Sequence, residues 1–235
     1  MTLRIQKLYK RYKELEIFED FNIDIPKNQV TCILGPSGCG KTTLLNMISG
    51  IVKADAGDFF CFDGKIMSYL FQEPRLLPWK SVWENIEFIL KDIYPKEERR
   101  KIVAEYLKMV TLEDFKDYYP KDLSGGMKQR VAIARAFAYP SDILLMDEPF
   151  KGLDVKTKEL LIKAFIKLWM EDLRTVIFVT HDIDEALLLG DKIYLFSHPP
   201  IKIKKSFELN IPKEKRELQS EKMLYMKKKI NEESR

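Results

Sequence analysis

Residues 35–42 read Gly-Pro-Ser-Gly-Cys-Gly-Lys-Thr, and this stretch decides the fold. Its spacing, G-x-x-x-x-G-K-[ST], is that of a loop that binds phosphate. Residues 30–34 before it predict a short buried strand, and residues 41–49 after it predict a helix that Gly50 ends. Glycines let backbone N–H groups turn onto phosphate oxygens, and the helix adds the positive end of its dipole. This order of elements predicts an α/β fold that binds a nucleoside triphosphate.

The residues of this loop have expected contacts with the nucleotide. Lys41 is expected to reach the β- and γ-phosphates, and the Thr42 hydroxyl is expected to ligate Mg²⁺. The alternative, an ordinary glycine-rich turn, is disfavoured by the strand before the loop and the helix after it. The residues predicted to contact the nucleotide here are Gly35, Pro36, Ser37, Gly38, Cys39, Gly40, Lys41, Thr42 and Thr43.

An apolar strand predicted at residues 143–147 ends on two adjacent carboxylates, Asp147 and Glu148. Burying a carboxylate is costly unless it meets a cation or takes part in chemistry. Side chains alternate along a strand, so these two should point in different directions and have different tasks. Asp147 suits the Mg²⁺ shell, and Glu148 suits a base that holds and deprotonates an attacking water. The alternative is a solvated strand end that caps the next element.

A second glycine-rich turn lies in residues 123–130, which read Leu-Ser-Gly-Gly-Met-Lys-Gln-Arg. Ser124 is a good helix N-cap, and Gly125 and Gly126 leave backbone donors exposed, so the turn predicts a second anion site. No strand precedes it that would make it another phosphate loop. Taken alone, the turn is equally well explained as a capped helix with no ligand.

The motifs, taken in order, resemble those of the nucleotide-binding subunits of ABC transporters, and the resemblance covers essentially the whole chain. Residues 123–129 match the signature that separates this family from other phosphate-loop proteins, and residues 143–148 match Walker B. The other matching positions are Tyr12, where the family stacks an aromatic on adenine, Gln72 of the Q-loop, Asp154 of the D-loop and the switch histidine His181. Each of three positions also has a simpler explanation. Tyr12 could be a core tyrosine, Gln72 could cap a turn, and His181 could be a neutral hydrogen-bonded histidine.

The resemblance implies a catalytic site shared by two chains. The catalytic residues would be Glu148, His181 and Gln72, and the metal ligands would be Thr42, Gln72 and Asp147. Two copies would pair head to tail, with ATP and Mg²⁺ between the phosphate loop of one and the signature of the other. ATP would close this homodimer and hydrolysis would reopen it. The signature and D-loop residues that would contact ATP are Ser124, Gly125, Gly126, Gln129 and Asp154.

A narrower resemblance, at residues 71–79, is to the importer group for nitrate, sulfonates, taurine and thiamine precursors. In that group the Q-loop region receives a short helix of the permease, which is the integral-membrane subunit. Leu76, Leu77, Pro78 and Trp79 would form this docking site, or would pack into the core as a plain loop. The resemblance implies a peripheral protein on the cytoplasmic side of the cell membrane, held by permease subunits, with a solute-binding protein as an indirect partner.

Two features depart from the importer group. The segment between residues 57 and 72 is short, and Lys151 replaces the small residue that is common before the D-loop glycine. We expect neither departure to touch a catalytic position.

The whole chain, residues 1–235, is expected to be a single ABC ATPase domain with a parallel sheet core. Alternation of apolar and polar residues predicts an N-terminal antiparallel β subdomain over residues 1–28, with further short strands within 57–72. A helical subdomain is expected at about 75–140, and the pattern over 95–139 is helical. Further expected elements are a helix at 155–171, strands at 175–179 and 193–196, and a C-terminal tail at 205–235.

The tail is rich in lysine and has apolar residues between the lysines. It fits either a basic amphipathic helix on a membrane surface or a surface helix packed on its own domain.

Composition narrows the class of protein. With 40 basic and 36 acidic residues the net charge is +4, and this near balance does not argue for a nucleic-acid binder, which usually has a clustered excess of basic residues. No apolar run approaches the ~18 residues that a membrane span requires, so a membrane connection must come through a partner. The alternative to transport is a soluble chromosome- or repair-type ATPase, which needs a long coiled-coil insertion or DNA-binding segments that 235 residues do not hold.

Overall fold

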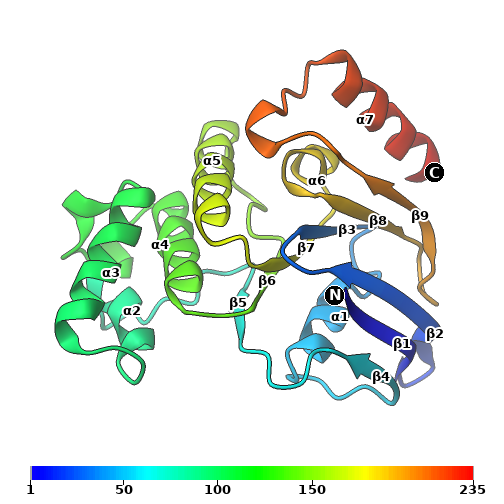
Figure 1. Ribbon diagram of the computed structural model, residues 1–235, viewed down its shortest axis with the longest axis horizontal. Helices are drawn as coiled ribbons and strands as arrows, with labels where there is room; N and C mark the ends of the chain where they lie inside the picture. Colours follow the sequence, from blue (N-terminus) through cyan, green and yellow to red (C-terminus); the bar gives the residue numbers. More distant parts are fainter. Residues whose placement is uncertain (1, 235) are drawn as a thin grey trace.

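The strand that leads into the phosphate loop lies inside a six-stranded sheet with the order β5-β6-β7-β3-β8-β9 (Figure 1). The computed structural model describes residues 2–234. Five neighbouring strands are parallel, and β9 pairs with β8 in the antiparallel sense. The predicted parallel core is therefore confirmed, with one antiparallel strand added at its edge. The strands are β3 (Val30–Leu34), β5 (Met67–Leu70), β6 (Ile143–Asp147), β7 (Thr175–Thr180), β8 (Lys192–Phe196) and β9 (Ile203–Glu208).

A second, three-stranded sheet forms the predicted antiparallel subdomain. It has the order β2-β1-β4, from β2 (Leu15–Pro26), β1 (Thr2–Tyr12) and β4 (Ala56–Phe60). Alternate side chains of β1, such as Leu3 and Ile5, are buried, as the period of a half-buried strand requires. This sheet covers α1 (Lys41–Ile48) and one face of the parallel sheet in a shared apolar core.

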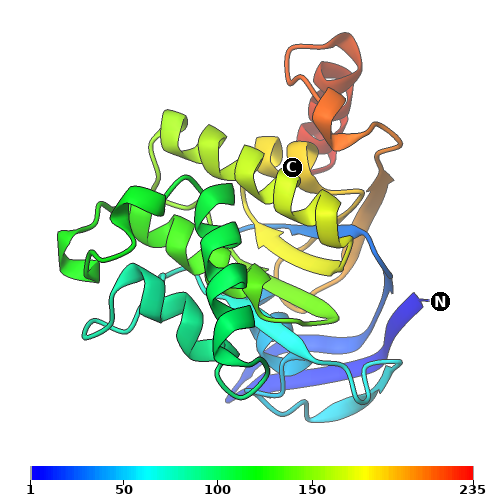
Figure 2. The same ribbon diagram turned by 60° about the vertical axis from the view of Figure 1, so that its left-hand side comes forward.

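The helical subdomain lies to one side of the parallel sheet (Figure 1, Figure 2). It contains α2 (Val82–Glu87), α3 (Lys96–Met109) and α4 (Gly125–Ala138). The helical pattern over 95–139 corresponds to α3 and α4, and it is interrupted between them, where Thr111 adopts a left-handed φ of 55° and two short 3₁₀ turns follow. Sequence reasoning also missed α2, which begins at a capping box formed by Ser81 and Glu84.

The other face of the parallel sheet carries the larger apolar core. Side chains of β3, β6 and β7 that point to this face pack with α4, α5 (Val155–Asp172) and α6 (Ile183–Leu189). Because both faces are covered, the strands are buried along their whole length and have no polar face. Among the described residues no helix is both long and apolar enough to cross a membrane.

The C-terminal tail packs on its own domain. Met223 and Ile230 of α7 (Glu221–Ser234) are buried in the larger core, and Lys227 Nζ lies 2.6 Å from Asp184 Oδ1 of α6. In both views α7 lies at the opposite end of the molecule from the helical subdomain (Figure 1, Figure 2). Of the two alternatives for the tail, the structure favours the surface helix over a membrane-bound one.

The N-termini of α4 and α5 touch at Gly126. A Cβ placed on Gly126 would lie 2.4 Å from Thr157 Cγ2, closer than two carbon atoms can approach. Thr157 is itself fixed, because its backbone N–H and its hydroxyl both donate to the carboxylate of Asp154, the N-cap of α5. The second glycine of the signature is therefore required for packing inside this chain. A Cβ placed on Gly125, in contrast, would meet no atom of the described residues within 4 Å.

We predict that Gly126→Ala lowers the free energy of unfolding by about 1–3 kcal/mol, because the added methyl overpacks the α4–α5 contact. Gly125→Ala is the matched control, and we expect it to be neutral or more stable by up to about 1 kcal/mol, because alanine restricts the unfolded chain. Urea denaturation followed by circular dichroism measures both. Equal unfolding midpoints for the two variants would contradict the packing role of Gly126.

Candidate active site

The phosphate loop joins β3 to α1 and directs Lys41 inward. Gly38 and Gly40 have φ values of 75° and 113°, which favour glycine, and a Cβ on Gly40 would lie 2.5 Å from Ile17 Cγ2. The Lys41 ammonium is buried and donates to the carbonyl oxygens of Gly35 at 2.7 Å and Pro36 at 2.8 Å. These carbonyls hold a positive charge against the concave side of the loop. The sequence-predicted loop thus has the shape and charge that an anion requires.

The three predicted metal ligands come together beside the loop. Thr42 Oγ1 donates to Asp147 Oδ1 at 3.0 Å, and Gln72 lines the same cavity of about 380 Å³. Burial raises the pKa of Asp147, and the hydrogen bond from Thr42 offsets this only in part. A hydroxyl, a carboxylate and an amide oxygen are the hard oxygen donors that Mg²⁺ prefers, and a cation would compensate the buried charge. The chemistry of these residues therefore fits a magnesium ion.

Glu148 lies among two lysines and a histidine. One carboxylate oxygen, Oε2, lies 2.7 Å from Lys151 Nζ and 3.3 Å from His181 Nδ1, and the other, Oε1, lies 3.9 Å from Lys41 Nζ. Burial raises the pKa of Glu148, but contacts with Lys151 and His181 outweigh it, so the pKa is below its ordinary value. Glu148 also has a left-handed φ of 42°, a strained conformation for a residue with a side chain.

The Glu148–Lys151 contact corrects the expectation that Lys151 stays away from catalytic positions. The two residues are joined by a turn in which Lys151 N–H donates to the Glu148 carbonyl at 3.1 Å. Their side chains form a close ion pair, but Glu148 Oε2 has no hydrogen-bond partner of proper alignment in the described chain. The short distance makes this a contact between charges, and the Oε2 atom can still accept an aligned hydrogen bond.

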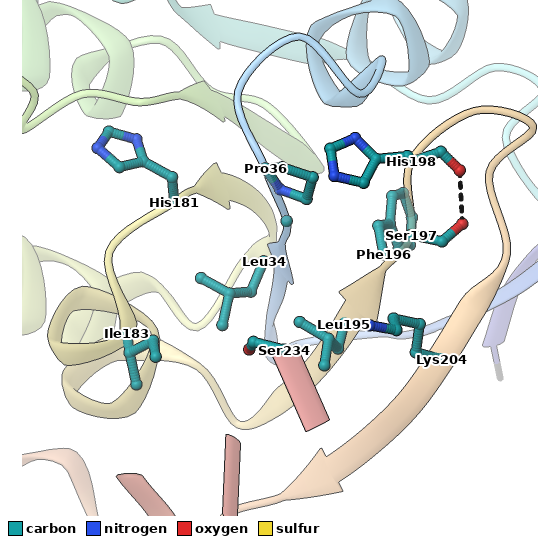
Figure 3. Close-up of a pocket in the computed structure, with 11 residues that line it drawn as sticks. Leu34, Pro36, His181, Ile183, Leu195, Phe196, Ser197, His198, Lys204 and Ser234 are labelled. Atoms are coloured by element: carbon teal, nitrogen blue, oxygen red, sulfur yellow. Dashed lines mark hydrogen bonds between the residues drawn. The ribbon is translucent and has the colours of Figure 1, made fainter. Parts of the chain in front are cut away.

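His181 stands at the mouth of a second cavity, of about 530 Å³ (Figure 3). In this view His181 and His198 lie on either side of Pro36 of the phosphate loop, above a floor of apolar side chains that includes Leu34 and Leu195. His181 directly follows β7, and Glu148 directly follows β6. Because these two strands are parallel neighbours, both residues lie at the same edge of the sheet. The half-exposed ring fits a hydrogen-bonding role at this edge better than a buried structural one.

The signature turn does not share these cavities with the phosphate loop. Residues 124–126 line neither the Thr42 cavity nor the His181 cavity. Ser124 is the N-cap of α4 and accepts a hydrogen bond from Met127 N–H at 3.2 Å, as the sequence predicts. Gln129 differs from the expected nucleotide contact: it is buried, and its Nε2 donates to the Pro149 carbonyl at 2.6 Å. Gln129 therefore ties the signature helix to the turn after Glu148.

Tyr12 and Asp154, two other predicted nucleotide contacts, lie on exposed parts of the chain. The Tyr12 side chain is 45% exposed near the end of β1, and Lys10 Nζ lies 5.2 Å from the centre of its ring. The alternative of a core tyrosine is thereby excluded. Asp154 caps α5 through Thr157, so its carboxylate has a structural role within the chain.

The predicted docking loop is held in shape by Asn85, which sequence reasoning missed. Asn85 is fully buried, accepts a hydrogen bond from Leu77 N–H at 2.8 Å and donates to the carbonyls of Leu77, Lys80 and Ser81. Leu76 and Leu77 are partly buried, whereas Pro78 is exposed and Trp79 is 70% exposed. A buried amide thus fixes a loop that leaves its tryptophan exposed.

Two basic residues connect the site to its surroundings, and neither was predicted. Arg135 of α4 donates to the carbonyls of Pro74 at 2.8 Å and Arg75 at 3.0 Å, which links the signature helix to the Q-loop. Lys158 of α5 pairs with Asp182 and Glu185 beside the switch histidine, at 2.8 Å and 2.7 Å. The sequence shows that both residues lie on predicted helices next to motifs. It does not identify the groups to which their side chains bind.

Comparison with known proteins shows the family. Residues 18–151 match the ABC transporter family. An aliphatic sulfonates import ATP-binding protein of Bacillus cereus is 42% identical over 212 residues, which cover 86% of this chain and 82% of that protein. An uncharacterized ABC transporter ATP-binding protein of Methanocaldococcus jannaschii is 38% identical, with 98% of this chain and 91% of that protein covered.

Solved structures agree with this result. The ATP-binding cassette MJ0796, a dimer in a post-hydrolysis state with ADP and Pi, matches with a TM-score of 0.76 and 33% identity over 89% of this chain and 99% of that one. CbiO1 from Clostridium perfringens, part of the ABC transporter complex cbiONQ, matches with a TM-score of 0.78 and 30% identity over 96% and 93% of the two chains. The chain described here belongs to the ABC transporter family, as an ATP-binding cassette that hydrolyses ATP.

Proposed function

We propose that this chain hydrolyses Mg²⁺-bound ATP between two copies of itself and so drives a membrane importer of small solutes. The observation that carries the proposal is the buried carboxylate of Glu148, which lies beside Lys41 and His181 and has one oxygen without an aligned hydrogen bond. An ionised carboxylate in this position can accept a proton from a water that attacks the γ-phosphate.

The neighbouring residues have separate tasks in this mechanism. Lys41 holds the β- and γ-phosphates once it exchanges its two carbonyl partners for phosphate oxygens. Thr42, Asp147 and Gln72 would hold Mg²⁺, which neutralises charge on the phosphates when bound. Glu148 orients and deprotonates the water, and His181, which lies 3.3 Å from Glu148, donates to the γ-phosphate.

A second copy supplies the other half of the site. Ser124, Gly125 and Gly126 form an anion site at the start of α4 that shares neither cavity with the phosphate loop of the same chain. In a head-to-tail homodimer this turn faces the nucleotide of the partner, and Tyr12 is free to stack on its adenine. ATP buried between the copies favours the closed dimer, and hydrolysis reopens it. The dimeric state of the MJ0796 cassette supports this arrangement.

The importer assignment depends on relatives and on one exposed loop. The Bacillus cereus relative is an aliphatic sulfonates import protein, and we extend the class to the nitrate, sulfonate, taurine or thiamine-precursor type. Leu76, Leu77, Pro78 and Trp79 present an apolar surface that suits a short helix of a permease subunit. The chain would thus work on the cytoplasmic face of the membrane, with a solute-binding protein as an indirect partner. No observation favours the repair-type alternative.

We predict that Glu148→Gln lowers ATP hydrolysis by at least about 100-fold and traps an ATP-bound dimer, because an amide cannot accept the proton of the water. Steady-state phosphate release and size-exclusion chromatography with Mg²⁺-ATP measure the two effects. Glu171→Gln, an exposed carboxylate at the end of α5, is the matched control and should behave as the wild type. A Glu148→Gln protein that stays monomeric with ATP and turns over at the normal rate would refute the assignment.

We also predict that Trp79→Ala weakens association with the permease and uncouples transport while ATP binding is retained, because the indole lies outside the nucleotide site. Co-purification with the membrane subunits and fluorescence titration with an ATP analogue separate the two properties. Tyr225→Ala, which removes an exposed aromatic of α7, is the control and should leave both unchanged. Normal co-purification of the Trp79 variant would exclude this docking site.

A further inference from the structure

The turn after β6 carries a lysine back onto the proposed base. Lys151 N–H donates to the Glu148 carbonyl, which closes a four-residue turn, and Phe150 within the turn is fully buried with its ring centre 6.1 Å from that of Phe178. Phe150 anchors the turn, and the turn places the backbone of Lys151 next to Glu148. From this position the ammonium reaches the Glu148 carboxylate at 2.7 Å.

The pair differs in burial at its two ends. The Glu148 side chain is 10% exposed, whereas the Lys151 side chain is 41% exposed. Water can therefore solvate the ammonium at little cost in free energy when it leaves the carboxylate. Their 2.7 Å contact involves Oε2, the carboxylate oxygen with no aligned hydrogen bond. Lys151 thus covers the oxygen of Glu148 that is otherwise available to a water.

The other charged groups that face Glu148 already have a place in the site. Lys41, from α1, is buried and held by two carbonyls of the phosphate loop. His181 follows β7 and lies 3.3 Å from Glu148, and Asp147 precedes Glu148 and bonds to Thr42. Only Lys151, among the groups that contact Glu148 in the described chain, has no task in binding nucleotide or metal.

We propose that Lys151 is a positioning residue that restrains Glu148, so that hydrolysis requires the ammonium to swing away from the carboxylate. The inference rests on the proposed role of Glu148. In the chemical step the water oxygen bonds to the γ-phosphorus, the bond from that phosphorus to the ADP oxygen breaks, and a water proton passes to the carboxylate. A cation at 2.7 Å stabilises the ionised carboxylate and competes with a water for Oε2.

The test is a substitution that removes the charge and keeps the stem. We expect Lys151→Met to raise kcat of the full-length protein roughly two- to five-fold at saturating Mg²⁺-ATP, with KM for ATP unchanged, because the side chain acts on Glu148 and not on the nucleotide. Lys151→Arg keeps the charge and should retain the wild-type kcat. Lys163→Met removes an exposed lysine from α5 and should have no effect.

A loss of packing at residue 151 would lower kcat or leave it unchanged, so a rise in kcat separates restraint from a structural role. An unchanged or lower kcat in Lys151→Met, or a change confined to KM, overturns the inference. In the Glu148→Gln background, Lys151→Met should give no acceleration, and a gain there would also overturn it. If Glu148→Gln alone keeps normal ATP hydrolysis, the proposed function of Glu148 is refuted. If Glu148→Gln is inactive and Lys151→Met is not faster than the wild type, only the proposed restraint by Lys151 is refuted.

Discussion

Two adjacent carboxylates at the end of one buried strand impose the constraint that the rest of the site satisfies. Asp147 is the last residue of β6 and Glu148 follows it; both are buried, and an uncompensated charge would be unstable there. The parallel sheet supplies it, because the carboxyl ends of β3, β6 and β7 meet at one edge. The loop after β3 brings Lys41 and Thr42, and the residue after β7 is His181. Sheet topology and charge compensation therefore specify the same site.

The charges of the two carboxylates are compensated unequally, and their ionisation therefore has opposite effects on the free energy of unfolding. The pKa of Asp147 is raised by burial, so its ionisation lowers the free energy of unfolding as the pH rises above the unfolded-state pKa. The pKa of Glu148 is lowered, despite burial, by Lys151 and His181, so it stabilises the fold above the unfolded-state pKa and loses this effect as the pH falls through the folded-state pKa. The charge of Asp147 is thus less well compensated than that of Glu148, whose carboxylate lies 2.7 Å from Lys151 Nζ and 3.9 Å from Lys41 Nζ.

The sequence predicted the elements and the motif residues because both depend on local pattern. A strand, a glycine loop and a lysine on the next helix have a fixed spacing, and the loop geometry follows from it. The sequence did not predict the partners of Lys151, Gln129 and Asn85, because these are set by a turn closure and by backbone carbonyls that no residue type identifies. For the same reason Thr111, an unremarkable residue in a helical pattern, was not recognised as the end of α3.

The hydrogen bond from Gln129 to Pro149 joins the two halves of the site in a way that motif order does not suggest. Pro149 lies in the turn between Glu148 and Lys151, and Gln129 lies one helical turn after the signature glycines. At 2.6 Å and fully buried, this bond resists independent movement of α4 and the turn. Within one chain, a buried hydrogen bond therefore links the anion site that the proposed dimer presents to its partner with the turn that sets the environment of the chain's own Glu148. Separating the two would leave buried polar groups without a hydrogen bond, which is costly in free energy.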